Sequence, residues 1–239
     1  MSDLDRLKHE AAARAVEYVT SGMRVGLGSG STAEAFINLL GARVRGGLDI
    51  VGVPTSERTA QLARSLGIAL GKLNDLAPLD LDVDGADEAD DALDLIKGGG
   101  GALLREKIVA ASSKKMIVMI HGSKLVAKMG AFPLPVEMVE FGHAETAKRI
   151  AAAVKALGYG DVPMTLRKKD DAIAKTDSGN VIYDLAFGPT ITEAASLATA
   201  LSCVPGVVEH GLYIGIATTL IVARSEGIEI IERSAAGKV

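Results

Sequence analysis

The chain carries a lysine, four consecutive glycines and a glutamate within one short stretch, from Lys97 to Glu106. A run of glycines persists where the backbone must turn sharply or approach a ligand closely, because glycine loses more conformational entropy on folding than any other residue. If this loop folds back over a bound molecule, the Lys97 amine and the Glu106 carboxylate face the same few atoms. They could then supply a cation for a developing oxyanion and a base for a proton. The alternative is a flexible surface loop followed by a charged surface helix.

The residues after the glycines favour a site. At about 100° per residue, the apolar residues of a helix over 103–111 leave almost no wholly polar face, and Glu106 falls between Val109 and Ala110. A carboxylate among apolar neighbours loses hydration, which raises its pKa toward the range that a general base needs near neutrality. We therefore expect Glu106 to be a desolvated base.

A second glycine motif, Gly26 to Ala33, stands where a predicted strand meets a predicted helix. Backbone N–H groups at a helix N-terminus, with serine and threonine hydroxyls beside them, form a natural phosphate cradle. From Gly28 the segment also fits the dinucleotide pattern G-x-G-x-x-A, a weak signal by itself. The acid that would bind a ribose at the end of the next strand is missing, since Asp49 lies at the beginning of that strand. We predict a phosphate cradle, with a cofactor loop and an ordinary helix cap as alternatives.

Another hydroxyl-rich helix start, residues 55–59, is expected at the same sheet edge. A helix cap on Ser56 or Thr55 and a ligand role are equally open there. A lysine also follows the apolar run Met116 to Ile120, which is typical of strands buried in parallel sheets. That lysine, Lys124, is placed as phosphate binding would require, and a solvated loop lysine is the alternative.

Acidic residues alternate along the next predicted strand, and strict alternation puts Asp80, Asp82 and Asp84 on one strand face. Because three carboxylates on one face cannot all be buried at low cost, we expect Asp80 and Asp82 to be solvated near a sheet edge. Gly85 is expected to end the strand, so that Asp84 and Asp87 lie in a loop at its carboxyl end, where open α/β sheets bind ligands. This pair could hold a divalent metal or be neutralised by the lysines of the site.

Composition limits the classes of protein that fit. The chain has 239 residues, of which 48% are hydrophobic and only 3% aromatic, so its core must be built from small and aliphatic side chains, as in an α/β protein. The net charge of -4 gives no broad basic patch, so we expect no nucleic-acid partner. The single cysteine, Cys203, excludes an intramolecular disulfide and is expected to be a small core residue. A signal peptide and a run of roughly 20 apolar residues are both missing, so we expect a cytoplasmic protein without a membrane partner.

Strand, loop and helix alternate through the first part of the chain. Helices are expected at 4–20 and 32–40, and strands at 23–27, 49–53, 79–83 and 116–120. This rhythm indicates an open, Rossmann-like, mostly parallel sheet with helices on both faces.

After Gly130 the order changes to β-α-β-β-α-β, the ferredoxin-like arrangement. The expected elements are strand 136–141, helix 144–157, strands 162–167 and 181–187, helix 192–201 and strand 207–213. The tail, 217–224 and 228–232, is expected to return as strands to the first domain. We therefore predict a Rossmann-like catalytic domain of residues 1–130 and 212–239 and a smaller ferredoxin-like α+β domain of residues 131–211.

Taken together, these motifs resemble ribose-5-phosphate isomerase of the A type in order and spacing over nearly the whole chain. The motifs are Gly28-Ser29-Gly30-Ser31-Thr32, Asp84-Gly85-Ala86-Asp87-Glu88, Lys97-Gly98-Gly99-Gly100-Gly101 with Arg105-Glu106-Lys107, Ser123-Lys124, and Phe132-Pro133-Leu134-Pro135-Val136-Glu137. The resemblance implies an aldose–ketose isomerase that interconverts D-ribose 5-phosphate and D-ribulose 5-phosphate through an enediolate. It also implies that no metal or cofactor takes part and that the protein is a homodimer or homotetramer.

The resemblance implies a role for each matching residue. Glu106 is then the base that moves a proton between C2 and C1, while Asp84 and Lys97 handle the sugar oxygens and Asp87 lines the same pocket. The phosphate would be bound by Ser31, Thr32, Lys124 and an amino-terminal lysine, for which we choose Lys8. The remaining expected substrate-binding residues are Gly28, Ser29, Gly30, Gly98, Gly99, Gly100 and Gly101.

Two other classes stay open. A non-catalytic sensor domain for sugar phosphates would keep the phosphate cradle but need no base, so Glu106 counts against it. A sugar-phosphate deaminase or lactonase is a second enzyme alternative, and the four scattered histidines give it no support.

Overall fold

The computed structural model describes residues 2–233, and its largest element is a seven-stranded sheet with the strand order β16-β15-β7-β4-β1-β2-β3. The strands are β1 (Arg24–Leu27), β2 (Val51–Pro54), β3 (Ala69–Leu70), β4 (Leu81–Gly85), β7 (Met116–His121), β15 (Thr219–Arg224) and β16 (Gly227–Glu232). All neighbouring pairs are parallel except the edge pair β15 and β16, which is antiparallel. The expected mostly parallel sheet is thereby confirmed.

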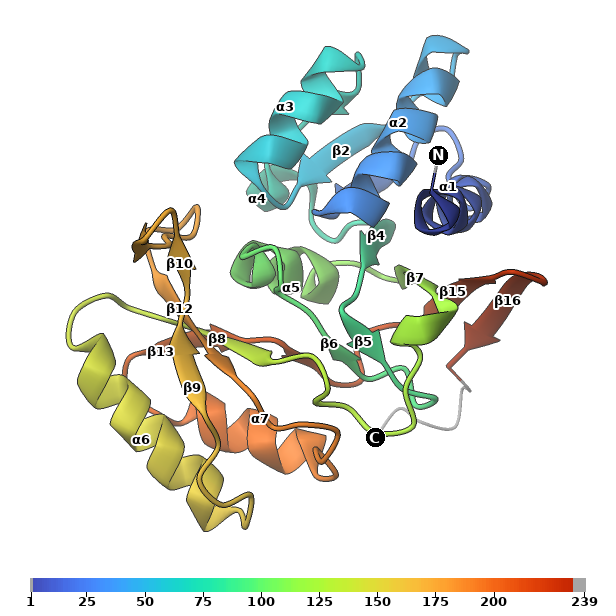
Figure 1. Ribbon diagram of the computed structural model, residues 1–239. Helices are drawn as coiled ribbons and strands as arrows, with labels where there is room; N and C mark the ends of the chain where they lie inside the picture. Colours follow the sequence, from blue (N-terminus) through green and yellow to red (C-terminus); the bar gives the residue numbers. More distant parts are fainter. Residues whose placement is uncertain (1, 234–239) are drawn as a thin grey trace.

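Helices cover both faces of this sheet (Figure 1). Helices α1 (Asp3–Val16), α2 (Ser31–Arg45) and α3 (Glu57–Ser65) lie on one face, and α4 (Leu73–Leu76) and α5 (Leu103–Ala111) on the other. The interior strand β7 shows why both faces are apolar. Its Ile117 and Met119 pack into the core under α1 and α2, whereas Val118 and Ile120 pack into the core on the α5 side.

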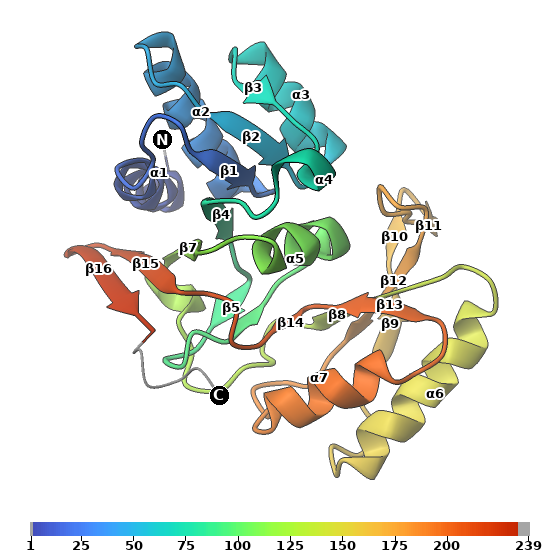
Figure 2. The ribbon, with the colours of Figure 1, turned by 180° about the vertical axis from the view of Figure 1, so that it is seen from behind.

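A short three-stranded sheet lies on the α5 side of the large sheet (Figure 2). It has the order β14-β6-β5 and consists of β5 (Glu88–Ala89), β6 (Leu95–Ile96) and β14 (Leu212–Tyr213). Strands β5 and β6 pair antiparallel and carry the chain from the end of β4 to the glycine loop. This small sheet therefore sets the distance between the acids after β4 and the loop at 97–101.

The smaller unit is an antiparallel sheet of order β13-β8-β12-β9 with a hydrophobic core of its own. Its elements are β8 (Leu134–Met138), α6 (His143–Ala156), β9 (Met164–Leu166), β12 (Val181–Leu185), α7 (Ala194–Ser202) and β13 (Val207–His210). A hairpin of β10 (Lys168–Lys169) and β11 (Ala172–Ile173) projects from it. The β-α-β-β-α-β order expected from the sequence is therefore present.

One expected strand is divided. Instead of one strand over 207–213, β13 joins the small sheet and β14 pairs with β6, with Gly211 between them. A Cβ atom on Gly211 would lie 2.3 Å from the Lys97 carbonyl oxygen, so the close approach of the two chains needs glycine there.

Two further findings concern sequence expectations. Cys203 was expected in the core, but it caps the end of α7 and is exposed, so that expectation is wrong. Among the described helices, none has the length and apolar character needed to cross a membrane. Residues 1 and 234–239 of the predicted main domain lie outside the described residues.

Candidate active site

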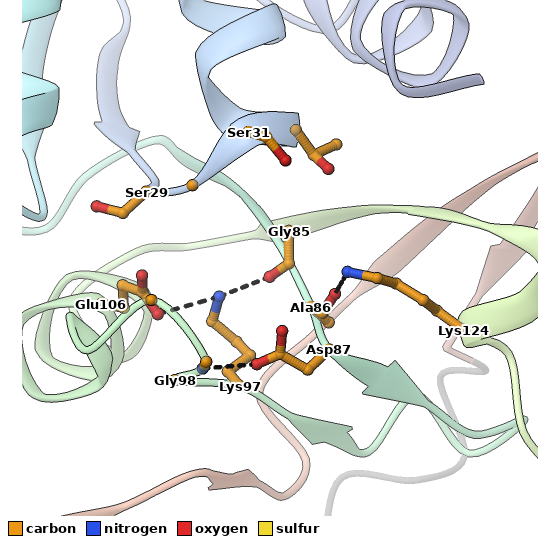
Figure 3. A pocket seen from close by; sticks show the side chains of 13 residues that line it. Ser29, Ser31, Gly85, Ala86, Asp87, Lys97, Gly98, Glu106 and Lys124 are labelled. Carbon is orange, nitrogen blue, oxygen red and sulfur yellow. Dashed lines mark hydrogen bonds and ion pairs between the residues drawn. The ribbon is translucent and has the colours of Figure 1, made fainter. Parts of the chain in front are cut away.

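A cavity of about 240 Å³ opens at the carboxyl ends of β1, β4 and β7 (Figure 3). It is lined by Ser29, Gly30, Ser31, Thr32, Gly85, Ala86, Asp87, Lys97, Gly98, Gly99, Gly100, Glu106 and Lys124. Four motifs that are far apart in the sequence, in segments 28–32, 84–88, 97–106 and 123–124, thus meet in one place. This edge is where an open α/β sheet leaves room for a ligand, because the loops diverge there.

At the floor of the cavity one lysine lies between two carboxylates. Lys97 Nζ donates to Asp84 Oδ2 at 2.8 Å and lies 3.2 Å from Glu106 Oε2. It also donates to the Gly85 carbonyl oxygen at 2.5 Å. The three charged residues expose only 1% to 4% of their surface, so their charges act on one another with little screening by water.

The two carboxylates beside Lys97 differ in how well their surroundings stabilise a negative charge. Asp84 also accepts hydrogen bonds from the backbone N–H groups of Ser29 at 3.1 Å and Gly85 at 2.7 Å, so it is well placed to hold the negative charge. Burial, and then the nearby charge of Asp84, raise the pKa of Glu106 to about 8. Burial opposes the charged form of Lys97, but Asp84 and Glu106 outweigh it and raise the pKa of that amine above its ordinary value. Near neutral pH the site therefore holds a charged lysine beside a glutamate that is ready to exchange a proton.

Asp87 also lines the cavity and fixes the glycine loop by a hydrogen bond. Its Oδ2 accepts a hydrogen bond from the Gly99 N–H at 2.8 Å. A Cβ atom at Gly99 would lie 2.9 Å from Asp87 Oδ1 and 2.8 Å from the ring of Phe132, so this position needs glycine. The loop therefore lies against both the acid and the ring.

The far end of the cavity suits an anion. Helix α2 begins at Ser31 without a side-chain cap, because its N-cap residue is Gly30 with a φ of 88°. Uncapped N–H groups at a helix start attract negative charge. Thr32 is buried, whereas Ser31 is exposed beside it. Lys124 reaches the same end and donates to the Ala86 carbonyl oxygen (Figure 3).

Lys8 is close to this end but is not among the described residues that line the cavity. Burial lowers the pKa of Lys124, and the charge of Lys8 contributes to that lowering. Burial, Lys124 and Lys8 likewise lower the pKa of His121. The charge of Lys8 therefore acts on this end of the cavity, although Lys8 does not line it.

Gly28 and Ser29 support the site from behind. A Cβ atom at Gly28 would lie 2.1 Å from Asp84 Oδ1, so only glycine lets the aspartate pack beneath this loop. The Ser29 hydroxyl is engaged by the hydroxyls of Thr55 at 2.8 Å, Ser56 at 2.8 Å and Thr59 at 3.1 Å. That hydroxyl therefore turns toward α3 and away from the other cavity-lining groups (Figure 3).

The hydroxyl-rich segment at 55–59 has a structural role. Ser56 is the N-cap of α3 and accepts a hydrogen bond from the Thr59 N–H at 3.1 Å. Thr55 and Thr59 are buried and donate to the carbonyl oxygens of Leu27 and Gly28. Of the two interpretations left open by the sequence, the helix cap is the one observed.

The expectation for Asp82 was wrong. Strand β4 lies in the middle of the sheet, and Asp82 is only 1% exposed, with no hydrogen-bond partner for its Oδ1 among the described residues. The neighbouring strand makes room for it, since a Cβ atom at Gly26 would lie 2.4 Å from Asp82 Oδ1. Burial, and then the charge of Asp84, raise the pKa of Asp82 well above its ordinary value. Asp80 is partly exposed and pairs with Lys114 at 2.8 Å.

Other placements differ in detail. Asp84 lies inside β4 rather than in the loop after it, so its side chain is fixed by the sheet, whereas Asp87 lies in that loop. Gly101 lines the wider cleft that adjoins the cavity, together with Arg167 of the small sheet, a residue that no local sequence pattern singled out. Residues 2–233 contain no group of three or more histidine, cysteine, aspartate or glutamate side chains arranged to hold a metal ion.

Comparison with known proteins gives one consistent result. Residues 51–227 match the family model described as ribose 5-phosphate isomerase A (phosphoriboisomerase A). A ribose-5-phosphate isomerase A from Parvibaculum lavamentivorans is 55% identical over 95% of this chain and 98% of its own length. One from Brucella suis is 51% identical over 98% of this chain and 100% of its own length.

Solved structures agree with the sequence matches. A ribose 5-phosphate isomerase from Plasmodium falciparum superposes with a TM-score of 0.91 at 34% identity, covering 95% of this chain and 98% of its own. A D-ribose-5-phosphate isomerase in complex with phospho-erythronic acid gives a TM-score of 0.88 at 36% identity, covering 97% and 100% of the two chains. Both the family model and these near full-length relatives place the chain in the ribose 5-phosphate isomerase A family.

Proposed function

We propose that this protein interconverts D-ribose 5-phosphate and D-ribulose 5-phosphate, with Glu106 as the base that moves the proton between C2 and C1. The observation that carries this proposal is the buried contact of 3.2 Å between Lys97 Nζ and Glu106 Oε2. It places a proton acceptor and a cation against the same small volume, as an enediolate intermediate requires.

The proton moves in two balanced steps. The ionised Glu106 carboxylate takes the C2 proton of the open-chain aldose, and the electron pair of that bond moves to form the C1–C2 double bond and a negative oxygen on C1. The C1 oxygen then gains a proton and the C2 hydroxyl gives one up, so that the negative charge moves from the C1 oxygen to the C2 oxygen. Glu106 finally returns its proton to C1 while the C2 oxygen becomes the ketone. A pKa of about 8 suits both steps, because the same group must accept a proton and give it back.

Lys97, Asp84 and Asp87 act on the sugar oxygens in this proposal. The Lys97 ammonium stabilises the enediolate oxygen, and Asp84 keeps that lysine charged through its contact of 2.8 Å. Asp87, which lines the cavity, and Asp84, which contacts Lys97, would exchange protons with the ring oxygen and the hydroxyls during ring opening. Asp87 also fixes the glycine loop through Gly99.

The phosphate is held at the other end of the cavity, by the first turn of α2 with Ser31 and Thr32 and by Lys124. Binding energy from this unreactive group can hold the reacting carbons against the base. Gly28 and Ser29 serve the site through Asp84 and through the hydroxyls of α3.

Three broader properties belong to the same proposal. Residues 131–211 form the small domain, and residues 1–130 and 212–239 form the catalytic domain. Two distinct hydrophobic clusters support this division, with Ile96, Met129 and Leu212 of the catalytic domain packing into the cluster of the small domain. The protein is a homodimer or homotetramer, and it works in the cytoplasm. Size-exclusion chromatography with light scattering would give the oligomeric state.

The direct test is to incubate the purified protein with ribose 5-phosphate and follow the formation of ribulose 5-phosphate. In D₂O the ribulose 5-phosphate should gain deuterium at C1, and ribose 5-phosphate formed in the reverse reaction should gain it at C2, because a carboxylate base can exchange its proton with solvent before returning it. A protein that binds ribose 5-phosphate without converting it would instead be the sensor domain considered from the sequence.

A further inference from the structure

Arg167 reaches from the small sheet to the glycine loop. It lies between β9 and β10, and its Nη1 donates to the carbonyl oxygens of Gly98 at 2.9 Å and Gly99 at 3.2 Å. In both ribbon views the β10 end of the small sheet lies beside α5 (Figures 1 and 2). A residue of the second unit therefore holds the backbone that lines the cavity.

The guanidinium is itself fixed. Its Nε donates to Asp184 Oδ2 at 2.9 Å and its Nη2 to Asp184 Oδ1 at 2.5 Å, a paired contact that sets the plane of the group. The arginine side chain is only 18% exposed and Asp184 23% exposed. Because a guanidinium has five N–H donors and four contacts are already made, Arg167 has little left to offer a substrate directly.

The contacts of Arg167 set the direction of two peptide groups. In a trans peptide the C=O and the following N–H point to opposite sides. Holding the Gly98 carbonyl on the Arg167 side sends the Gly99 N–H the other way, where it donates to Asp87 at 2.8 Å. Holding the Gly99 carbonyl in the same way turns the Gly100 N–H away from Arg167, and this N–H donates to no group of residues 2–233.

The loop is also a closed turn, which limits its other conformations. The Gly101 N–H donates to the Gly98 carbonyl oxygen at 3.0 Å, and both Gly98 and Gly101 have positive φ angles of 105° and 83°. Because glycine residues have access to a wide range of φ and ψ angles, the conformation of this loop depends on the groups that bind its backbone. Arg167 on one side and Asp87 on the other are those groups.

A second contact fixes the small sheet near this point. Asp177 Oδ2 accepts a hydrogen bond from the Glu57 N–H at 2.9 Å, and its carbonyl oxygen accepts one from Arg105 at 3.1 Å. Arg105 is on α5, one residue before Glu106. The small unit is therefore attached to α3 and α5 through Asp177, and Arg167 is linked to the strands on either side of Asp177 by backbone hydrogen bonds with Ile182 and Ala174.

We propose that Arg167 is a positioning residue, which orients the glycine loop from the small sheet so that the Gly100 N–H is presented to the sugar oxygens of the bound substrate. The inference rests on the proposed isomerase function for the identity of that substrate. Arg167 does not touch the reacting atoms and acts through the two glycine carbonyls.

The test compares two ligands that use different ends of the cavity. Inorganic phosphate probes the α2 and Lys124 end, whereas phospho-erythronic acid adds a sugar-like chain and a carboxylate that reach toward the glycine loop. Arg167→Met should leave the affinity for inorganic phosphate within about 2-fold of wild type, because the substitution does not touch the α2 and Lys124 end of the cavity. The same variant should bind phospho-erythronic acid more weakly than wild type does. Its kcat should fall on the order of 10²-fold, which is typical when a hydrogen-bond donor to the reacting group is misplaced.

Three variants complete the experiment. Asp184→Asn keeps the arginine but loosens its orientation, so it should show the same pattern to a smaller degree and serves if Arg167→Met folds poorly. Arg167→Lys keeps the charge but not the paired geometry, so it should resemble the methionine variant rather than wild type. Arg149→Met changes an exposed arginine of α6 in the same unit and should change neither ligand affinity nor kcat.

Three results would each overturn the proposal. Arg167→Met could lose affinity equally for both ligands, it could keep the wild-type kcat, or Arg167→Lys could restore the wild-type affinities and kcat in full. The pH dependence of kcat should keep its shape, since Arg167 does not contact Glu106. If the wild-type protein binds both ligands but converts no ribose 5-phosphate, the proposed function fails, while the two affinities still decide the role of Arg167.

Discussion

Replacing Glu106 with glutamine should remove a proton acceptor and also a pH-dependent cost to folding. The glutamate is 4% exposed, and its pKa is raised from 4.5 to about 8 by burial and by Asp84. A raised pKa means that the folded protein keeps a proton which the unfolded chain has already released above pH 4.5. The stability that this proton provides is complete below the unfolded pKa and is lost as the pH rises through the folded pKa.

The size of the effect follows from the same pKa values. Between pH 6 and pH 9 the wild-type protein should lose roughly 2 to 3 kcal/mol of unfolding free energy through this one group. Glutamine has the same shape and carries no proton equilibrium. The difference in stability between Glu106→Gln and wild type should therefore shift in favour of the variant by about that amount over this range, because titrating groups away from Glu106 contribute equally to both proteins.

Two measurements test this reasoning. Urea unfolding of both proteins at pH 6 and pH 9 gives the stability difference, with the exposed Glu232→Gln as a matched control that should show no such shift. Steady-state kinetics should show a loss of about 10² to 10⁴ in kcat for Glu106→Gln with little change in KM. The wild-type kcat/KM should rise about tenfold per pH unit below pH 8 and level off above it. A parallel pH dependence of stability in both proteins, or near-normal kcat in the variant, would refute the assignment.

Three further predictions address the rest of the site. Lys124→Ala should raise KM for ribose 5-phosphate and weaken the affinity for inorganic phosphate measured by calorimetry, with some loss of kcat; unchanged values would place the anchor elsewhere. Exhaustive treatment with EDTA should leave full activity, whereas a loss that added Mg²⁺ restores would assign Asp84 and Asp87 as metal ligands. Gly28→Ala should cost about 1 to 3 kcal/mol in thermal unfolding, because its Cβ atom would lie 2.1 Å from Asp84 Oδ1. Gly100→Ala, whose Cβ atom meets nothing within 4 Å, should leave the melting temperature nearly unchanged, and equal losses in the two variants would contradict the steric argument.

Long apolar runs and regular alternation made the main architecture predictable. The apolar run that became β7 fits a strand with helices on both faces, and the ferredoxin-like order after Gly130 follows from evenly spaced strands and helices. The two-residue strands β5, β6 and β14 carry too little pattern to be recognised. Their pairing depends on contacts between segments far apart in the chain, such as Leu212 with Ile96.

A site residue was predictable where its own segment determines its surroundings. It was not predictable where a residue on a neighbouring strand determines whether the side chain is buried. The burial of Glu106 follows from its helical neighbours, and the structure confirms it. Asp82 was misplaced because the cost of burying carboxylates was judged from β4 alone. Gly26 on β1 leaves the space that makes burial possible, and register across strands is not visible in a single sequence. Arg167 was missed for a similar reason, since it meets Gly98 across 69 positions of chain.

The buried charges explain why one lysine is sufficient for the proposed reaction. Asp82, Asp84 and Glu106 are all buried near Lys97, and one ammonium cannot neutralise three carboxylates. The raised pKa values of Asp82 and Glu106 resolve the imbalance by leaving Asp84 as the paired anion. When Glu106 ionises and then takes a proton from carbon, negative charge passes from its carboxylate to the enediolate oxygen within the field of the same lysine. The net charge of the cluster with its substrate stays constant through that step, so little reorganisation of the surroundings is needed.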